Sequence, residues 1–267
     1  MENKHKIWLV ASDVHIPEEN SSVVDCWLQT VDLLKPAGII LNGDIMNCGT
    51  FSRHDIFSAP KCHWTDSEFL EASSPDFDRM NAFLDAIQKI SPKSKKIFNM
   101  GNHEEWLNEF IKRSPRARNR LFSFEERLLL TDRSWKVVDY RKFSKIGKLR
   151  VTHTLFDSRS GGGGGKHHAA KHVETMGASI LYGHYHDIQT ASKVTPERNS
   201  HMAWCAGCLC DLNPGYLRNG PQNWSHGFAV VYLFPDNNFQ VDIKRVVKGK
   251  VVVNGKLLDG AKHVFWK

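Results

Sequence analysis

The segment IWLVASDVH, residues 7–15, joins an apolar run to an acidic side chain and an imidazole. Residues 7–11 are apolar without polar alternation, which is typical of a buried strand. Asp13 and His15 follow directly, so we expect them where this strand gives way to a loop. Side chains two apart on an extended chain point to the same face. The segment therefore predicts a strand whose end presents a pair of metal-ligating side chains.

The same arrangement recurs four times further along the chain. In each case a short apolar run is followed by polar side chains of metal-ligating type. One such motif alone is more often an ordinary turn, but five in order make coincidence remote. The four later motifs are Gly43-Asp44 after residues 38–41, Gly101-Asn102-His103-Glu104 after 97–100, His153 after 149–152, and Gly183-His184-Tyr185-His186 after 179–182.

These residue types indicate a particular chemistry. Carboxylate and amide oxygens and imidazole nitrogens bind hard or borderline divalent cations, and a carboxylate can bridge two of them. Two divalent ions, two aspartates and a bridging hydroxide leave a charge of about +1, which attracts phosphate. Two metals about 3.5–4 Å apart also lower the pKa of the water between them, which yields a nucleophile for in-line attack on phosphorus. We expect His103 to protonate the leaving oxygen and Glu104 to orient the His103 ring.

The ordered motifs resemble those of the calcineurin-like metallophosphoesterase family, whose pattern is Asp-x-His, Gly-Asp, Gly-Asn-His-Asp/Glu, His and Gly-His-x-His. The resemblance spans residues 13–186 and implies an α/β fold, a four-layer α/β/β/α sandwich with two central mixed sheets. It also implies two divalent metal ions. Their ligands would be Asp13, His15, Asp44 and His186 for the first ion, and Asp44, Asn102, His153 and His184 for the second.

Within the family, residues 208–216 and 224–228 are similar to small phage or prophage phosphoesterases. The chain departs from the common pattern at Thr154, where a glycine is usual, which affects only the local turn. Ile16 replaces the glycine of the serine/threonine protein phosphatase branch, and the Asp-Arg-Gly expected after Gly43-Asp44 is absent. These departures argue against a protein phosphatase of that branch.

The 267 residues are expected to form a single domain, because neither an internal repeat nor a linker interrupts the pattern. Strands and helices alternate up to residue 182, and mainly antiparallel strands follow. Residues 50–75 lose periodicity and predict a loop insertion, and residues 158–167, which include five glycines, predict a flap near the metals. The expected helices are 23–35, 76–90, 104–112, 124–130 and 166–176, and the later strands are 188–193, 201–206, 227–233, 239–247 and 251–253.

Composition bears on location and partners. The apolar runs are strand-length, whereas a bilayer span needs about 20 residues, and the first six residues lack a signal-peptide pattern. We therefore expect a cytoplasmic protein with no membrane association. Six cysteines show no disulfide framework. The formal net charge of +7 suits a polyanion such as nucleic acid.

Several residues outside the motifs are candidates for substrate binding. Arg53 and His54 lie in the predicted loop after Asp44 and, with Asn102, could touch substrate, although an exposed polar loop explains the first two equally well. The basic stretch at residues 112–120 fits either a grip on a nucleic-acid backbone or a solvated helix end. Three tryptophans could stack on bases or pack in the core. They are Trp64, Trp106 and Trp224.

Two further clusters, one of histidines and one of cysteines, contain metal-ligating residue types, but a structural role explains each of them better. His167, His168 and His172 fit a solvated or internally satisfied helix face. Cys205, Cys208 and Cys210 suggest a zinc knuckle, yet no fourth ligand at a suitable spacing completes it, so buried thiols are expected.

The sequence thus predicts a dinuclear-metal-dependent phosphohydrolase, a phosphodiesterase acting on nucleic acid or nucleotides through a metal-bridging hydroxide. Manganese is the favoured metal, and iron, zinc or nickel suit the same ligands. The alternatives are a phosphomonoesterase for a small metabolite or phosphoprotein, and a non-catalytic scaffold of the same fold. A nuclease working within a larger complex ranks lower, because nothing like the capping region of repair exonucleases follows His186. The oligomeric state has no signal in the sequence.

Overall fold

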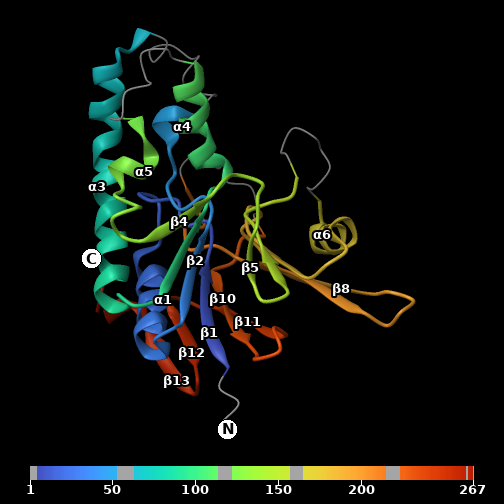
Figure 1. Cartoon of the computed structure of the whole chain (residues 1–267). Coiled ribbons are helices and arrows are strands. Elements are labelled where there is room, and N and C mark those ends of the chain that lie inside the picture. Colours follow the sequence, from blue (N-terminus) through green and yellow to red (C-terminus); the bar gives the residue numbers. More distant parts are fainter. Residues whose placement is uncertain are drawn as a thin grey trace.

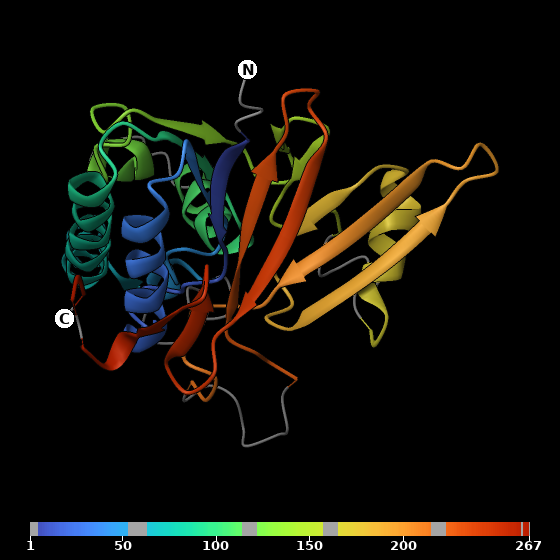
Figure 2. The same ribbon diagram turned by 90° about the horizontal axis from the view of Figure 1, so that it is seen from below.

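Two β-sheets pack face to face, and helices cover the outer face of each (Figure 1, Figure 2). A computed structural model describes residues 5–52, 63–113, 122–156, 165–214, 223–262 and 264–266. Both sheets are mixed. The α/β/β/α layers are those implied by the resemblance to the calcineurin-like metallophosphoesterases, so the predicted fold class is confirmed.

The first sheet has six strands in the order β11-β10-β1-β2-β3-β4. Strands β1 to β4 run parallel, whereas β10 pairs antiparallel with β1 and β11 with β10. Because β1, β2 and β3 are parallel, the motifs that follow them meet at one edge of the sheet. The strands are β1 (Lys6–Ala11), β2 (Gly38–Asn42), β3 (Lys95–Asn99), β4 (Trp135–Val138), β10 (Gly227–Leu233) and β11 (Phe239–Arg245).

The second sheet has five strands in the order β5-β6-β7-β9-β8. Strands β6 and β7 are parallel, which places His153 and His184 at the same edge. Strand β9 is also parallel to β7, so the later strands are not purely antiparallel. The strands are β5 (Ser144–Ile146), β6 (Leu149–Val151), β7 (Ile180–Tyr182), β8 (Ile188–Val194) and β9 (Ser200–Ala206).

Apolar side chains fill each interface between layers. Between the sheets, Val10 and Ile40 of the first sheet pack with Leu181 of the second. Helices α1 (Ser21–Leu34) and α3 (Asp66–Ile90) cover the other face of the first sheet. Helix α6 (His168–Met176) packs on β7, β8 and β9 on the opposite side of the molecule (Figure 2). A hairpin of β12 (Lys250–Val253) and β13 (Lys256–Asp259) packs against α1.

Helix α3 corrects the predicted loop at residues 50–75, because it begins at Asp66 rather than at residue 76. The Thr65 hydroxyl accepts from the Glu68 N–H, and the Glu68 carboxylate accepts from the Thr65 N–H. This capping box satisfies two N–H groups at the helix start. Pro75 lies inside the helix, and the Ser74 hydroxyl donates to the Leu70 carbonyl at 2.8 Å, one turn back. The prediction is wrong because Pro75 is typical of a loop, whereas the capping box at Thr65 begins the helix before it.

Other boundaries differ slightly from prediction. Helix α4 spans Asn102–Arg113, and α5 ends at Arg127 rather than at residue 130. Strands β5 and β13 were not predicted. Residues 158–164 of the expected flap lie outside the described residues, and α6 begins at His168, two residues later than expected. No helix among the described ranges has both the length and the apolarity to cross a membrane.

Candidate metal centre

The five motifs meet at the ends of β1, β2, β3, β6 and β7, where backbone hydrogen bonds tie their loops together. The Asp13 N–H donates to the Gly43 carbonyl at 3.0 Å, and the His15 N–H donates to the Asp44 carbonyl at 3.0 Å. In the second sheet, the Gly183 N–H donates to the His153 carbonyl at 2.9 Å. The candidate ligands are therefore carried by loops whose backbones support one another.

Five of the predicted ligands adopt left-handed backbone conformations, which side chains other than glycine rarely do. Such residues cost on the order of 1–3 kcal/mol each and concentrate at functional sites. The expectation that Asp13 and His15 share a face because the strand continues is wrong, since β1 ends at Ala11. A turn brings them together instead. The φ values are 55° for Asp13, 55° for His15, 50° for Asp44, 77° for His184 and 60° for His186.

Two groups of side chains, buried except for the half-buried His184, could each hold a cation, with ligand atoms within 4.8 Å of one another. In the first group, His186 Nε2 lies 3.1 Å from Asp13 Oδ1 and 3.1 Å from His15 Nε2. In the second, His153 Nε2 lies 3.2 Å from Asp44 Oδ2. The groups are Asp13, His15 and His186, and Asp44, His153 and His184.

Asp44 lies between these two groups. Its Oδ2 is 3.9 Å from His15 Nε2 and 3.8 Å from His103 Nε2. Its Oδ1 accepts from the His103 N–H at 2.9 Å. Asn102 Oδ1 is 3.1 Å from His153 Nε2, so the amide faces the second group. Asp44 is thus the carboxylate positioned to serve both groups.

Four imidazoles share one orientation, with Nε2 inward and Nδ1 against an outer acceptor. In a neutral ring this contact holds the proton on Nδ1 and leaves the Nε2 lone pair for a cation. The Nδ1 partners are the Asn42 carbonyl for His153 at 3.0 Å, Asn47 Oδ1 for His15 at 3.4 Å, the Asn47 carbonyl for His103 at 2.6 Å, and Cys210 Sγ for His186 at 3.7 Å.

Protonated imidazoles balance the negative charge of the buried Asp13 carboxylate. Burial acts to raise the pKa of Asp13, but His186 and His153 outweigh it and bring this pKa to about 2. Burial acts to lower the pKa of His186, yet the Asp13 carboxylate raises it to about 10. A bound cation would replace the positive charge that protonated rings supply to the carboxylates.

His15 and His184, one from each group, have lowered pKa values instead. Burial, together with neighbouring imidazoles, lowers the pKa of His15 to about 3 and that of His184 to about 4. Both rings are therefore neutral over the ordinary pH range. A neutral ring is the form that binds a divalent cation.

Glu104 does not have the predicted role of orienting the His103 ring. It is fully buried, and its carboxylate accepts from four backbone N–H groups. Burial and the nearby Asp44 raise the pKa of Glu104 to about 7, although these hydrogen bonds oppose the shift. The His103 ring contacts the Asn47 carbonyl and the Trp106 ring instead. The four donors are the N–H groups of Asp44 at 3.0 Å, Ile45 at 2.8 Å, Met46 at 3.0 Å and Gly101 at 2.8 Å.

Two motif glycines allow the carboxylates to approach the neighbouring backbone. A Cβ on Gly101 would lie 2.1 Å from Asp44 Oδ1, and one on Gly183 would lie 2.5 Å from Asp13 Oδ2. The Gly183-His184 peptide also donates to Asp13, from the His184 N–H at 3.0 and 3.1 Å. Side chains at either position would push the carboxylate out of its place.

The residues predicted to bind substrate lie in different parts of the chain, and only some of those that the structure describes are near the metal centre. Arg53, His54 and residues 114–121 lie outside the described residues. At the end of α4, Lys112 pairs with Glu105 at 3.0 Å, as expected of a solvated helix end. Trp106 and Trp224 lie against the imidazoles of the site, with ring centroids 3.9 Å from His103 and 4.1 Å from His186, whereas Trp64 packs on Phe69.

The histidine cluster on α6 bears out its structural interpretation at His168. This ring is buried and lies 2.7 Å from the Tyr182 hydroxyl and 3.0 Å from Asp187. His167 is exposed, and His172 is buried with its Nδ1 2.8 Å from the His168 carbonyl. The cysteines at 205, 208 and 210 are buried free thiols, as expected. The contact of Cys210 with His186 has no signal in the sequence.

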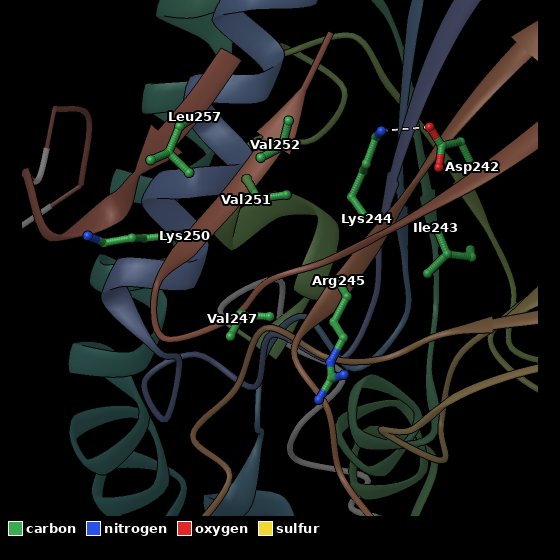
Figure 3. Close-up of a pocket in the computed structure, with 9 residues that line it drawn as sticks. All are labelled: Asp242, Ile243, Lys244, Arg245, Val247, Lys250, Val251, Val252 and Leu257. Atoms are coloured by element: carbon green, nitrogen blue, oxygen red, sulfur yellow. Dashed lines mark ion pairs between the residues drawn. The ribbon is translucent and has the colours of Figure 1, made fainter. Parts of the chain in front are cut away.

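A surface pocket lies over β11 and the β12–β13 hairpin (Figure 3). Apolar side chains such as Val252 and Leu257 line it together with basic ones, and Lys244 pairs with Asp242 at 2.6 Å. No residue of the five motifs is among those that line it. This pocket is therefore separate from the candidate metal centre.

Comparisons with known proteins identify similar structures only. No family model and no curated protein matches the chain. It is similar to Vacuolar Protein Sorting 29 from Cryptosporidium parvum, at 12% identity over 96% of this chain and 98% of that one, with a TM-score of 0.44. It is also similar to a predicted phosphoesterase from Streptococcus pneumoniae, at 14% identity over 91% and 90% with a TM-score of 0.34. Vps29 from Entamoeba histolytica, complexed with Zn²⁺, is 11% identical over 95% and 99%, with a TM-score of 0.42.

Proposed function

We propose that this chain is a dinuclear-metal-dependent phosphohydrolase, and that its substrate is a phosphodiester of nucleic acid or of a nucleotide. One observation carries the proposal. Four imidazoles turn Nε2 toward Asp13 and Asp44, while an acceptor behind each ring holds Nδ1. This orientation prepares nitrogen lone pairs around two carboxylates. The order of the motifs, similar to that of the calcineurin-like metallophosphoesterases, supports the same conclusion.

The donor set fits two divalent cations. The nitrogen and oxygen donors suit manganese, iron, zinc or nickel, and we propose manganese. Bound cations would supply Lewis-acid stabilisation of the phosphoryl oxygens and would lower the pKa of an attacking water. The proposed ligands are Asp13, His15, Asp44 and His186 for one cation, and Asp44, Asn102, His153 and His184 for the other.

His103 is proposed to protonate the leaving oxygen. Its side chain is 16% exposed, whereas that of Asp44 is 2% exposed, so His103 is the more accessible of the two to a substrate. Its Nδ1 contacts the Asn47 carbonyl and therefore keeps a proton. Nε2 then has a transferable proton only in the doubly protonated ring. The Trp106 ring, 3.9 Å away between centroids, fixes the plane of this imidazole.

Preference for a nucleotide diester is supported by the aromatic rings beside the site. Half-buried Trp106 and Trp224 lie against His103 and His186, respectively. Stacking of a base on an aromatic side chain contributes about 1–3 kcal/mol and tolerates any base. The net charge of +7 favours a polyanionic substrate. A phosphomonoesterase needs neither feature.

The test is a comparison of two aryl substrates by the manganese-loaded protein. We expect a bis-aryl phosphate to be hydrolysed with the higher kcat/KM, and a mono-aryl phosphate with the lower. His103→Asn should lower kcat by about 100-fold or more while manganese stays bound. The exposed His167→Asn variant is the matched control and should keep full activity. A preference for the monoester would favour a phosphomonoesterase, and absence of both metal and turnover would favour a scaffold.

A second set of substrates identifies which class of phosphodiester the protein hydrolyses. Single-stranded DNA, duplex DNA, RNA and cyclic nucleotides are offered to the same protein. Trp224→Ala should raise KM for the preferred nucleic-acid substrate about tenfold with little change in kcat, because stacking binds the base without touching the phosphorus. An unchanged KM would contradict the role of the tryptophan.

A further inference from the structure

A pair of sulfur atoms lies behind His186, on the side of the ring away from Asp13. Cys208 and Cys210 are buried, and their Sγ atoms and a ring nitrogen of His186 lie within 4.8 Å of one another. Cys210 Sγ is 3.7 Å from Nδ1, whereas Asp13 Oδ1 is 3.1 Å from Nε2 of the same ring. The imidazole of His186 therefore stands between two groups of possible ligands.

The spacing of this sulfur group matches a tetrahedral cation. Zinc binds thiolate sulfur at about 2.3 Å and imidazole nitrogen at about 2.0 Å, so tetrahedral angles place the two ligand atoms about 3.5 Å apart. The 3.7 Å between Cys210 Sγ and His186 Nδ1 is close to that value. Little movement of the side chains is needed.

The loop that carries the cysteines is fixed by backbone hydrogen bonds. The N–H groups of Leu209 and Cys210 both donate to the Asp13 carbonyl, at 3.0 and 3.1 Å. The Cys208 N–H donates to the Ser225 carbonyl at 3.0 Å. The thiols are thus held beside His186 before any cation binds, which lowers the entropic cost of binding.

We propose that Cys208, Cys210 and His186 Nδ1 form a sulfur-containing site for a thiophilic divalent cation, zinc or cadmium, with water as the fourth ligand. Binding forms two bonds to sulfur and one to nitrogen. The two thiol protons leave to solvent, and no oxidation or reduction takes place. In the sequence, the lack of a fourth protein ligand argues against a zinc knuckle. The proposed site does not need a fourth protein ligand, because His186 supplies the third donor and water supplies the fourth.

Occupation of this sulfur site would withdraw His186 from the candidate metal centre. A neutral imidazole has one lone pair. When Nε2 faces a cation beside Asp13, the proton is on Nδ1 and is donated to Cys210. When Nδ1 binds a cation between the cysteines, the proton moves to Nε2. The two positions are therefore antagonistic; this second part rests on the proposed function, whereas the sulfur site itself does not.

The site is tested with cadmium on the full-length, manganese-free protein. We expect one equivalent of ¹¹³Cd to give an NMR shift typical of two sulfur ligands, together with a thiolate-to-cadmium absorption band in the ultraviolet. Asp44→Asn should keep both signals, and so should Cys205→Ser, which removes a buried thiol of the same region. The double variant Cys208→Ser with Cys210→Ser should lose both. A wild-type shift in the nitrogen and oxygen range would overturn the proposal without relying on any variant, and so would a band that persists in the double variant.

The antagonism is measured by manganese binding to cadmium-loaded protein, followed by electron paramagnetic resonance. We expect the affinity for one manganese ion to fall at least tenfold while the two-sulfur cadmium signal persists. Unchanged manganese affinity at full cadmium occupancy would refute the sharing of His186. Failure of the cadmium-free protein to bind manganese would instead count against the proposed function.

Discussion

The carboxylate of Glu104 accepts a hydrogen bond from the backbone N–H of Asp44 at 3.0 Å, 60 residues away in the chain. Through this contact and three others, Glu104 ties the start of α4 to the loop that follows β2. The proposed bridging carboxylate therefore owes its position to a buried side chain that does not itself face the site. In this structure Glu104 is a positioning residue.

Glu104→Ala should destabilise the protein by about 3 kcal/mol or more, because it leaves four buried N–H groups without their acceptor. Glu105→Ala is the control. Its half-buried side chain pairs with Lys112, and we expect a loss below about 1 kcal/mol. Urea unfolding of both variants measures the difference. Equal losses for the two would show that the buried contacts contribute little.

Gly101→Ala should abolish binding of the cations while the fold is kept. Its new Cβ would lie 2.1 Å from Asp44 Oδ1 and 2.3 Å from the Asp44 backbone nitrogen, so Asp44 must move together with its carboxylate. Gly49→Ala is the matched control, because the nearest atom to its Cβ is 3.5 Å away. Manganese binding by calorimetry tests the pair. Tight binding of two ions by Gly101→Ala would show that Asp44 can shift without loss.

Asp76 should make stability depend on pH. Burial raises its pKa to about 6, although the Arg127 guanidinium opposes the shift. The folded state then holds this proton more tightly than the unfolded chain, so the free energy of unfolding falls as pH rises from about 4 to about 6. Asp76→Asn removes this loss and should gain stability relative to wild type over the same interval. The exposed Asp78→Asn is the control, and denaturant unfolding at several pH values measures both. A difference between Asp76→Asn and wild type that stays constant with pH would contradict this assignment.

The positions of the proposed ligands could be predicted because each follows a buried strand. In Ile7 to Ala11 the apolar run and the polar residues after it are neighbours in the sequence, so local pattern is sufficient. The two mixed sheets were implied by the resemblance of the five motifs to those of the calcineurin-like metallophosphoesterases, and the alternation of strands and helices agrees with them. What could not be predicted is the local geometry, since Asp13 and His15 converge through left-handed turns rather than along a strand.

The contacts behind the ligands could not be predicted because they join distant segments. Three of the N–H groups that donate to Glu104, those of Asp44, Ile45 and Met46, lie 58 to 60 positions from it. Cys210 approaches His186 through the loop after β9. Neither contact corresponds to a residue spacing that could be recognised as a motif in a single sequence. The start of α3 is a different case, because the capping box formed by Thr65 and Glu68 is a local sequence signal for a helix start, whereas Pro75 is unusual inside a helix.

The central claim is that Asp44 serves two cations that together hydrolyse a phosphodiester. It is tested most directly by measuring manganese stoichiometry and bis-aryl phosphate turnover for wild type and Asp44→Asn under the same conditions. We expect two manganese ions per wild-type chain, and in the variant the loss of at least one ion and of turnover, with an unchanged circular dichroism spectrum. Full turnover by Asp44→Asn, or a wild-type protein that neither binds manganese nor hydrolyses the diester, would contradict the account.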